Sequence, residues 1–404
     1  MRADIRQYLV VTGNYWAFTL TDGALRMLIV LHFYQLGYTP LAIASLFLFY
    51  EFFGIVTNLV GGWLGARLGL NNTMNIGLLL QVIALAMLLV PAEALTVVWV
   101  MVAQAVSGIA KDLNKMSAKS AIKLLLPEHA QNALYKWVAL LTGSKNALKG
   151  VGFFLGGLLL SLLGFSGAIA LMAAALLLVW LLSLCLLKQD LGKTSFKPKF
   201  SQLLSKSPAL NTLSAARLFL FAARDVWFVI ALPLYLASQF NWPHSAVGGF
   251  LACWVIGYGI VQALAPRITG NSKQQAPGAS ALLFWALPLC ALPLLIAAGI
   301  SYTPQTLAVL LGGLLLFGVV FAINSALHSY YIVRLARADG VSLDVGFYYM
   351  ANAAGRLLGT GLSGWAYQYW GLVACLIISS LLLLAAVGCS WRLTTLNIEN
   401  SYGG

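Results

Sequence analysis

Charged side chains interrupt several long apolar runs of this sequence, and their chemistry is the first thing to explain. The first run holds Asp22 and Arg26, and the fourth holds Lys111 and Asp112. Others placed in this way are Glu51, Lys115, Lys145, Lys149, Arg224, Asp225 and Arg356. At the centre of a membrane helix such a residue costs roughly 2.5–3.5 kcal/mol, so it is expected to face the protein interior or water. Seven cations against four anions leave three positive charges, which favours a negatively charged substrate.

The spacing of these residues indicates which of them could act together. Asp22 and Arg26 lie four residues apart and can pair on one helix. Glu51 has no partner in its own run, so it either pairs with a cation such as Arg356 or is the titrating carboxylate of a proton-coupled cycle. Arg224 and Asp225 are adjacent on a helix and are expected to point different ways, so at least one of them needs another partner.

The fourth run carries a ladder of lysines at four-residue spacing. Lys111 and Lys115 are central, whereas Lys119 and Lys123 lie nearer the end of the run. Like charges at this spacing repel each other, and Asp112 can relieve Lys115, three residues on. We expect Lys119, like Arg217 in a later run, to extend toward the membrane surface.

Several Lys and Arg groups suit a phosphate- or arsenate-type oxyanion, because Arg offers a planar fork of donors and Lys a compact charge. Neutral side chains in the same runs could add hydrogen bonds, although ordinary contacts between helices explain any single one of them equally well. The neutral candidates are Asn114 and Tyr330, and also Asn14, Asn58, Asn324, Tyr331 and Asn352.

The composition defines the elements that must hold these groups. The chain has 404 residues, of which 61% are apolar and 9% charged, and its mean hydropathy is +0.87. A soluble domain has about 25% charged residues. The composition therefore excludes an ordinary soluble enzyme, a nucleic-acid-binding module and a disordered chain, and it indicates a protein embedded in the lipid bilayer.

The apolar runs predict an all-α membrane protein with twelve transmembrane helices. Turn residues such as Gly37, Pro127 and Pro304 separate the runs. The expected helices cover residues 8–36, 40–66, 73–92, 95–124, 136–164, 167–187, 209–239, 243–267, 278–300, 304–335, 343–370 and 371–391.

Lys and Arg residues lie in alternate loops between these helices, among them Arg67, Arg267, Lys273 and Arg334. The positive-inside rule then places these loops and both termini in the cytoplasm. The longest polar stretch predicts a linker at 189–208 between an N-terminal half at 1–188 and a C-terminal half at 209–404, each with six helices.

Residues of the two halves match at constant offsets. Asp22 and Asp225 differ by 203 positions, Asn114 and Asn324 by 210, and Lys149 and Arg356 by 207. An even number of helices separates the matches, so the repeat is parallel, as in the major facilitator superfamily. Glycines four residues apart in the fifth and eleventh helices predict close helix packing. They are Gly152 and Gly156, and Gly355 and Gly359.

No catalytic, metal or cofactor site is predicted, and the chain is not expected to be an enzyme. Its five cysteines are scattered and form no CxxC pair, and its four histidines form no HExxH frame. The short motif at 164–167 (Gly-Phe-Ser-Gly) resembles that of intramembrane proteases but has no histidine partner nearby. No glycine-rich phosphate loop is present.

Residues 61–69 (Gly-Gly-Trp-Leu-Gly-Ala-Arg-Leu-Gly) resemble the loop motif of the major facilitator superfamily, with Ala66 at its usual acidic position and Leu70 at a basic one. More specifically, three stretches resemble the organoarsenical efflux permeases of bacterial arsenic-resistance operons, the ArsJ family, and the similarity covers most of the chain. They are 14–26 (Asn-Tyr-Trp-Ala-Phe-Thr-Leu-Thr-Asp-Gly-Ala-Leu-Arg), 49–54 (Phe-Tyr-Glu-Phe-Phe-Gly) and 107–119 (Ser-Gly-Ile-Ala-Lys-Asp-Leu-Asn-Lys-Met-Ser-Ala-Lys).

This resemblance implies a secondary exporter in the bacterial inner membrane that confers arsenate resistance. Its substrate would be 1-arseno-3-phosphoglycerate, which glyceraldehyde-3-phosphate dehydrogenase makes when arsenate replaces phosphate, so the two proteins would act together. Arg26 and Arg224 would hold the anionic ends of the substrate. Two alternatives remain open: a transporter of another phosphorylated or carboxylated organic anion, and a membrane-embedded sensor that transports nothing.

Overall fold

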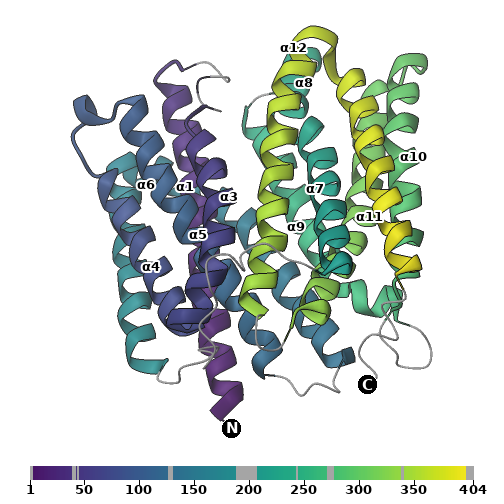
Figure 1. The fold of residues 1–404 in the computed structure, drawn as a ribbon. Helices are drawn as coiled ribbons and strands as arrows, with labels where there is room; N and C mark the ends of the chain where they lie inside the picture. Colours follow the sequence, from purple (N-terminus) through teal and green to yellow (C-terminus); the bar gives the residue numbers. More distant parts are fainter. Residues whose placement is uncertain are drawn as a thin grey trace. The chain divides into compact units, whose positions relative to one another are not determined.

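The computed structural model describes residues 3–38, 42, 45–125, 131–187, 207–242, 244–270, 277–337 and 341–396. Within these ranges the chain is helical and contains no strand, as the sequence predicts (Figure 1). The helices are α1 (Ala3–Gln35), α3 (Leu48–Leu68), α4 (Leu70–Met87), the short 3₁₀ helix η1 (Ala92–Ala94), α5 (Val97–Leu125), α6 (Gln131–Leu186), α7 (Pro208–Phe228), α8 (Ala231–Gln239), α9 (His244–Thr269), α10 (Ser280–Tyr302), α11 (Thr306–Leu335) and α12 (Val341–Thr395).

The two longest helices, α6 and α12, are each two helices joined at a glycine. The backbone leaves the helical region at Gly164 (φ 67°, ψ −178°) and at Gly371 (φ 74°, ψ −170°). Glycine adopts a positive φ at little cost because it has no Cβ. These are the positions at which the sequence predicts one helix to end and the next to begin, so both predicted breaks are confirmed.

The helix predicted at 209–239 is interrupted instead of continuous. It ends as α7 at Phe228 and resumes as α8 at Ala231. Pro233, in the first turn of α8, has no N–H to donate to the carbonyl of Val229, and in a continuous helix its ring would clash with that carbonyl. The apolar pattern continues through this position, which explains why hydropathy alone did not predict the break.

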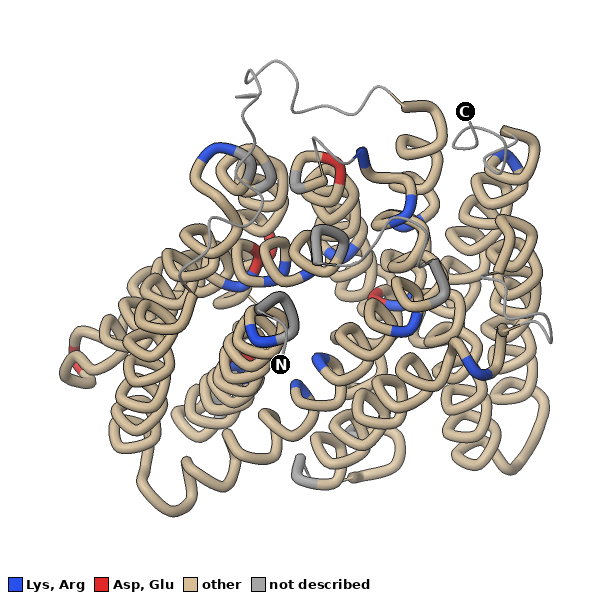
Figure 2. The backbone as a smooth tube through the Cα atoms, turned by 90° about the horizontal axis from the view of Figure 1, so that it is seen from below, with Lys and Arg blue, Asp and Glu red and all other residues tan. Residues whose placement is uncertain are grey.

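Seven helices of the described chain are long and apolar enough to cross a membrane. Helices α1, α3 and α5 are not among the seven, and they carry many of the ionisable residues identified above. Figure 2 shows how sparse charge is in the described part of the chain, where short blue and red stretches interrupt a tan backbone. The few charged residues are therefore the natural place to look for function.

The chain forms two compact units that are not identical with the two halves of the sequence. Unit 1 comprises residues 1–130, 144–205 and 336–350, and unit 2 comprises 131–143, 206–335 and 351–404. Helices α6 and α12 therefore contribute residues to both units. The linker at 189–208 stays a prediction, because residues 188–206 lie outside the described part of the chain.

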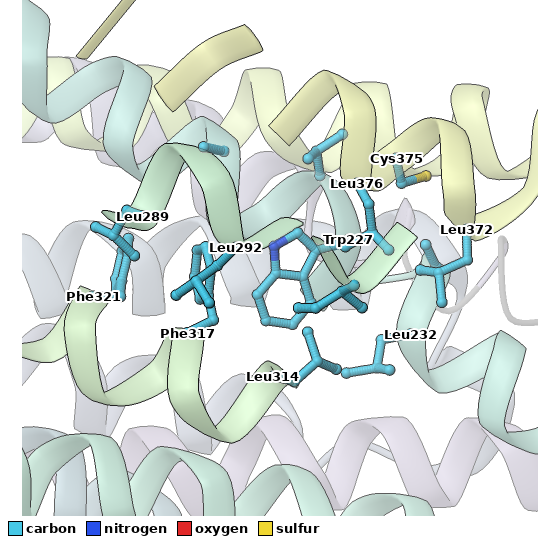
Figure 3. Packing of buried hydrophobic residues seen from close by; sticks show 14 of the residues in the cluster. Trp227, Leu232, Leu289, Leu292, Leu314, Phe317, Phe321, Leu372, Cys375 and Leu376 are labelled. Atoms are coloured by element: carbon cyan, nitrogen blue, oxygen red, sulfur yellow. The ribbon is translucent and has the colours of Figure 1, made fainter. Parts of the chain in front are cut away.

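Each unit is built around one helix. In unit 1, α5 packs against α1, α3 and α4, and in unit 2, α11 packs against α7, α9 and α10. The core of unit 2 contains the fully buried Trp227, which Figure 3 shows beside Phe317. The ring of Trp227 lies edge-on to that of Phe317 at 5.2 Å and to that of Trp254 at 6.0 Å. Such ring pairs contribute about 0.5–1.5 kcal/mol each beyond the area they bury, so they hold the helices of this unit in register.

Candidate functional site

An ion pair joins α1 to α3 in unit 1. Nη2 of Arg26 lies 3.2 Å from Oε1 of Glu51. The guanidinium carbon of Arg26 is also 4.8 Å from the ring centre of Phe47 and 4.7 Å from that of Tyr50, which adds cation–π attraction. Glu51, for which the sequence offered Arg356 as a possible partner, thus pairs with Arg26.

Two lysines of the ladder on α5 share one carboxylate. Asp112 is 1% exposed, and its oxygens lie 2.6 Å from Nζ of Lys115 and 3.7 Å from Nζ of Lys111. The predicted relief of Lys115 by Asp112 is confirmed. Nζ of Lys111 also lies 3.8 Å from the ring centre of Tyr50 on α3. This group of two lysines and one carboxylate keeps a formal charge of +1.

The ladder continues to a tyrosine at the start of α12, within unit 1. The ring centre of Tyr349 is 4.4 Å from Nζ of Lys115 and 5.2 Å from Nζ of Lys119. Lys119 is only 3% exposed, so the expectation that it extends to the membrane surface is wrong. The reason is that residues 336–350 belong to unit 1 and supply an aromatic face where the sequence offered none.

The fourth carboxylate of the prediction, Asp22, makes a different kind of contact. It is 5% exposed, and its Oδ1 accepts a hydrogen bond of 2.6 Å from the hydroxyl of Tyr50. The sequence spacing suggested a pair between Asp22 and Arg26, whereas Arg26 is engaged by Glu51. Tyr50 therefore touches a carboxylate with its hydroxyl and two cations with its ring.

In unit 2 a single carboxylate again serves two cations. Asp225 is 1% exposed, and Nε of Arg224 donates to its Oδ1 at 2.6 Å, while Nε of Arg356 lies 3.5 Å from its Oδ2. The adjacent residues Arg224 and Asp225 thus pair with each other, contrary to expectation, because the long arginine side chain can turn back. The sequence predicted a further partner for at least one of these two residues, and Arg356 is the second partner of Asp225. This group also keeps a formal charge of +1.

Arg217 is a buried cation that was not among the predicted interior cations. It is 3% exposed and does not extend to the membrane surface as expected. Its Nε donates to Oδ1 of Asn352 at 3.0 Å and its Nη1 donates to Oγ of Ser325 at 2.9 Å. The ring of Phe221 lies 4.0 Å from its guanidinium carbon. Two neutral acceptors and an aromatic ring thus hold this charge in the interior of unit 2.

The other predicted site residues are Lys145, Lys149, Asn114 and Tyr330. Lys145 and Lys149 are half-buried on α6 in unit 1, and Nζ of Lys149 is 5.8 Å from the ring centre of Phe153. Asn114 donates to the backbone carbonyl of Ala110 at 2.9 Å, one turn back on its own helix. Tyr330 packs against Tyr135, with ring centres 4.9 Å apart. These contacts favour the structural interpretation for Asn114 and Tyr330.

The comparisons with known proteins decide the family. The family model described as Major Facilitator Superfamily matches residues 10–293, more than two thirds of the sequence. This chain belongs to the major facilitator superfamily. A search of curated proteins finds no match.

Solved structures of transporters share this fold. The Escherichia coli fucose:proton symporter FucP has a TM-score of 0.73 and 15% identity, over 97% of this chain and 99% of the symporter. The human organic anion transporter MFSD10 has a TM-score of 0.73 and 17% identity, over 96% and 99%. A bacterial homologue of the iron transporter ferroportin has a TM-score of 0.73 and 12% identity, over 98% and 100%. Major facilitator proteins are transporters rather than enzymes, so this chain is a multi-pass membrane transporter, as predicted.

The offsets of the predicted repeat also relate Arg217 to a position in the first part of the chain. The sequence offsets of 203, 210 and 207 relate three residues of unit 1, one each on α1, α5 and α6, to three residues of unit 2, namely Asn14 to Arg217, Lys115 to Ser325 and Lys145 to Asn352. The three in unit 2 are joined by the hydrogen bonds of Arg217. At these offsets Arg217 corresponds to the neutral Asn14, and the charged Lys115 and Lys145 correspond to the neutral Ser325 and Asn352. The offsets were a signal that could have identified Arg217 from the sequence, whereas neither charge nor spacing assigned a role to Tyr50 or Tyr349.

Close helix packing at the paired glycines, expected in a major facilitator protein, is confirmed. A Cβ on Gly152 would lie 2.6 Å from the backbone oxygen of Leu20, and one on Gly359 would lie 2.6 Å from that of Ala222. Gly156 and Gly355 are packed in the same way. The contacts join α1 to α6 in unit 1 and α7 to α12 in unit 2. They hold α1 and α7, which carry Arg26 and Arg224, firmly against their neighbours.

Proposed function

We propose that this transporter is a secondary active exporter of an anionic organoarsenical, 1-arseno-3-phosphoglycerate, and that it confers arsenate resistance by alternating access. The observation that carries the proposal is the sharing of carboxylates. Asp112 faces two lysines and Asp225 faces two arginines, so each buried group keeps one positive charge. A buried surplus of cations is costly unless an anion arrives to balance it.

The positive groups would act on the substrate in different ways. Arg224 and Arg356 offer forked donors that match the oxygens of phosphate or arsenate. Lys111 and Lys115 offer compact charges on flexible side chains, which can follow those oxygens as the substrate moves. Lys145 and Lys149 would add positive potential along the route of the substrate. Arg26 would contribute its charge when the transport cycle loosens its pair with Glu51.

The cysteines favour a pentavalent over a trivalent arsenic compound. Trivalent arsenic binds clustered thiolates, whereas the five cysteines are spread over four helices and differ in exposure from exposed to buried. In the described part of the chain no cluster of His, Cys, Asp or Glu could hold a metal ion. Nitrogen donors are thus the groups available for the arsenic-bearing end.

The topology that we propose has twelve spans in two halves of six. Helices α6 and α12 count as two spans each, because Gly164 and Gly371 divide them, and α7 with α8 counts as one. The distribution of Lys and Arg supports cytoplasmic loops at Arg67, Arg267 and Arg334, cytoplasmic termini, and a location in the bacterial inner membrane.

The test joins the transporter to the enzyme that would supply its substrate. Arsenate-sensitive bacteria expressing glyceraldehyde-3-phosphate dehydrogenase are challenged with arsenate, with and without this chain. We expect resistance that Lys111→Ala and Arg26→Ala abolish at normal protein levels, and that the exposed Lys136→Ala preserves. Uptake of freshly made substrate into inverted vesicles then shows transport directly. Wild-type resistance in both site variants would remove the site assignment.

A second candidate, a transporter of another phosphorylated or carboxylated anion, is favoured by the same shared carboxylates. The structural similarity to the human organic anion transporter is compatible with it at the level of the fold. The arsenate challenge distinguishes the two, because this candidate predicts vesicle uptake of an organophosphate without arsenate resistance.

A further inference from the structure

Two arginines of α7 contact the same aromatic ring in unit 2. The guanidinium carbon of Arg217 lies 4.0 Å from the ring centre of Phe221, and that of Arg224 lies 4.6 Å from it. The two carbons therefore cannot be farther apart than the sum of these distances. The two arginines are separated by about two helical turns, which places both on one face of α7. Two positive charges held this close repel each other, and a ligand with two negative charges relieves that repulsion.

The charged residues around this ring leave two positive charges uncompensated by one another. Arg224 and Arg356 share the carboxylate of Asp225 and keep one positive charge between them. Arg217 adds the second, and the two acceptors described above for its guanidinium are neutral. A phosphate monoester carries about 1.5 to 2 negative charges at pH 7, more than the single charge of a carboxylate or a phosphate diester. The charge of a monoester therefore matches this part of unit 2 best.

Neutral polar groups from two other helices surround the two arginines. Tyr258 on α9 is hydrogen-bonded to Ser325 through its hydroxyl, which also accepts from Nε2 of Gln262 at 2.9 Å. The charges of both arginines act on this hydroxyl. On the next turn of α11, Nδ1 of His328 and Oγ of Ser329 are buried and have no hydrogen-bond partner in the described part of the chain. Buried polar atoms are nearly always hydrogen-bonded, so these two atoms favour a polar ligand at this place.

We propose that Arg217 and Arg224 form a subsite that selects a doubly charged phosphate monoester over a singly charged anion. The two guanidinium groups bind the phosphate oxygens with forked donors, and the hydroxyl of Ser325 adds a hydrogen bond. Charge-assisted hydrogen bonds to phosphate are stronger than the contacts of the arginines with Phe221, so the ring gives way to the anion. The inference rests on the proposed function, because it takes an organophosphate as the substrate. It gives a binding role to Arg217, which the proposed function leaves unused.

The experiment compares two probes that differ in the charge on one phosphate. Purified protein is titrated by calorimetry, at mildly alkaline pH, with glycerol 3-phosphate and with its phosphate methyl ester, which is a singly charged diester. We expect the wild type to prefer the monoester roughly 10–100-fold. Arg217→Gln should bind the diester nearly as before and lose most of this preference. The matched control is Lys136→Gln, which removes an exposed charge from the same unit and should keep the preference.

The ratio of the two affinities separates recognition from stability, because partial unfolding lowers the binding of both probes alike. Arg217→Lys keeps the charge but loses the fork, so it provides a second variant, and we expect an intermediate ratio. A wild-type ratio in both Arg217 variants would overturn the inference, and so would a wild type that binds neither probe or does not distinguish them.

The arsenate challenge tests the proposed function separately. Resistance without an Arg217-dependent preference would refute only the phosphate subsite. The preference without resistance would support the subsite and refute organoarsenical export.

Discussion

The contact between α1 and α6 gives the sharpest test of the packing, through the substitution Gly152→Ala. The added Cβ would lie 2.6 Å from the carbonyl oxygen of Leu20, 3.0 Å from the amide nitrogen of Ala24 and 3.1 Å from Cα of Gly23. All three are backbone atoms, so no side chain can turn aside. Restoring an ordinary contact of about 3.4 Å requires the two helices to separate by roughly 0.8 Å, and overpacking of this kind costs about 1–3 kcal/mol.

The matched control is Gly157→Ala, on the same helix and in the same unit. Its Cβ would meet only a methyl group of Leu31, at 3.5 Å, which is an ordinary contact. Both substitutions gain the same helix propensity, up to about 1 kcal/mol, so the difference between them isolates the overpacking cost. In thermal unfolding of the purified protein we expect Gly152→Ala to melt on the order of 5 °C below Gly157→Ala. Equal melting temperatures would show that α1 and α6 are not in backbone contact.

Three other predictions concern the charged groups. Asp225→Asn leaves its two arginines without their shared carboxylate and should cost about 3–5 kcal/mol, seen as a loss of folded protein in gel filtration; an unchanged elution profile would contradict the shared pair. Arg217→Gln keeps a hydrogen-bond donor but removes a charge, and we expect organophosphate affinity to fall roughly 10–100-fold with little change in melting temperature. Tyr349→Leu removes the ring over Lys115 and Lys119 and should lower the melting temperature more than Tyr349→Phe does; equal effects would exclude the cation–π contacts.

Hydropathy was enough to predict an all-helical membrane protein. The breaks at Gly164 and Gly371 were predictable because a positive φ favours glycine. The predicted parallel repeat indicated the family that the family model matches. The break before Pro233 was missed because a proline near the start of a helix is tolerated, and the apolar pattern continues through it.

The charged residues were found from the sequence, but most of their partners were not. Spacing along one helix predicted the pair of Asp112 with Lys115 and suggested a pair of Asp22 with Arg26. The pair of Asp112 with Lys115 forms because α5 offers Asp112 no better-placed cation. The pair of Asp22 with Arg26 does not form, because Arg26 pairs with Glu51 on another helix. Partners across helices depend on tertiary packing, which a periodic pattern does not encode.

Helices α6 and α12 each contribute residues to both units, which matters if the chain is expressed as two fragments. A cut anywhere in residues 188–206 would yield two fragments, and each would carry a helical stretch (131–143 or 336–350) that completes the other. Each fragment made alone would lack a contact of its own unit, because Tyr135 packs against Tyr330 and Tyr349 lies over Lys115. Synthesised together, the two pieces would complement one another, and each would act as a folding template for its counterpart.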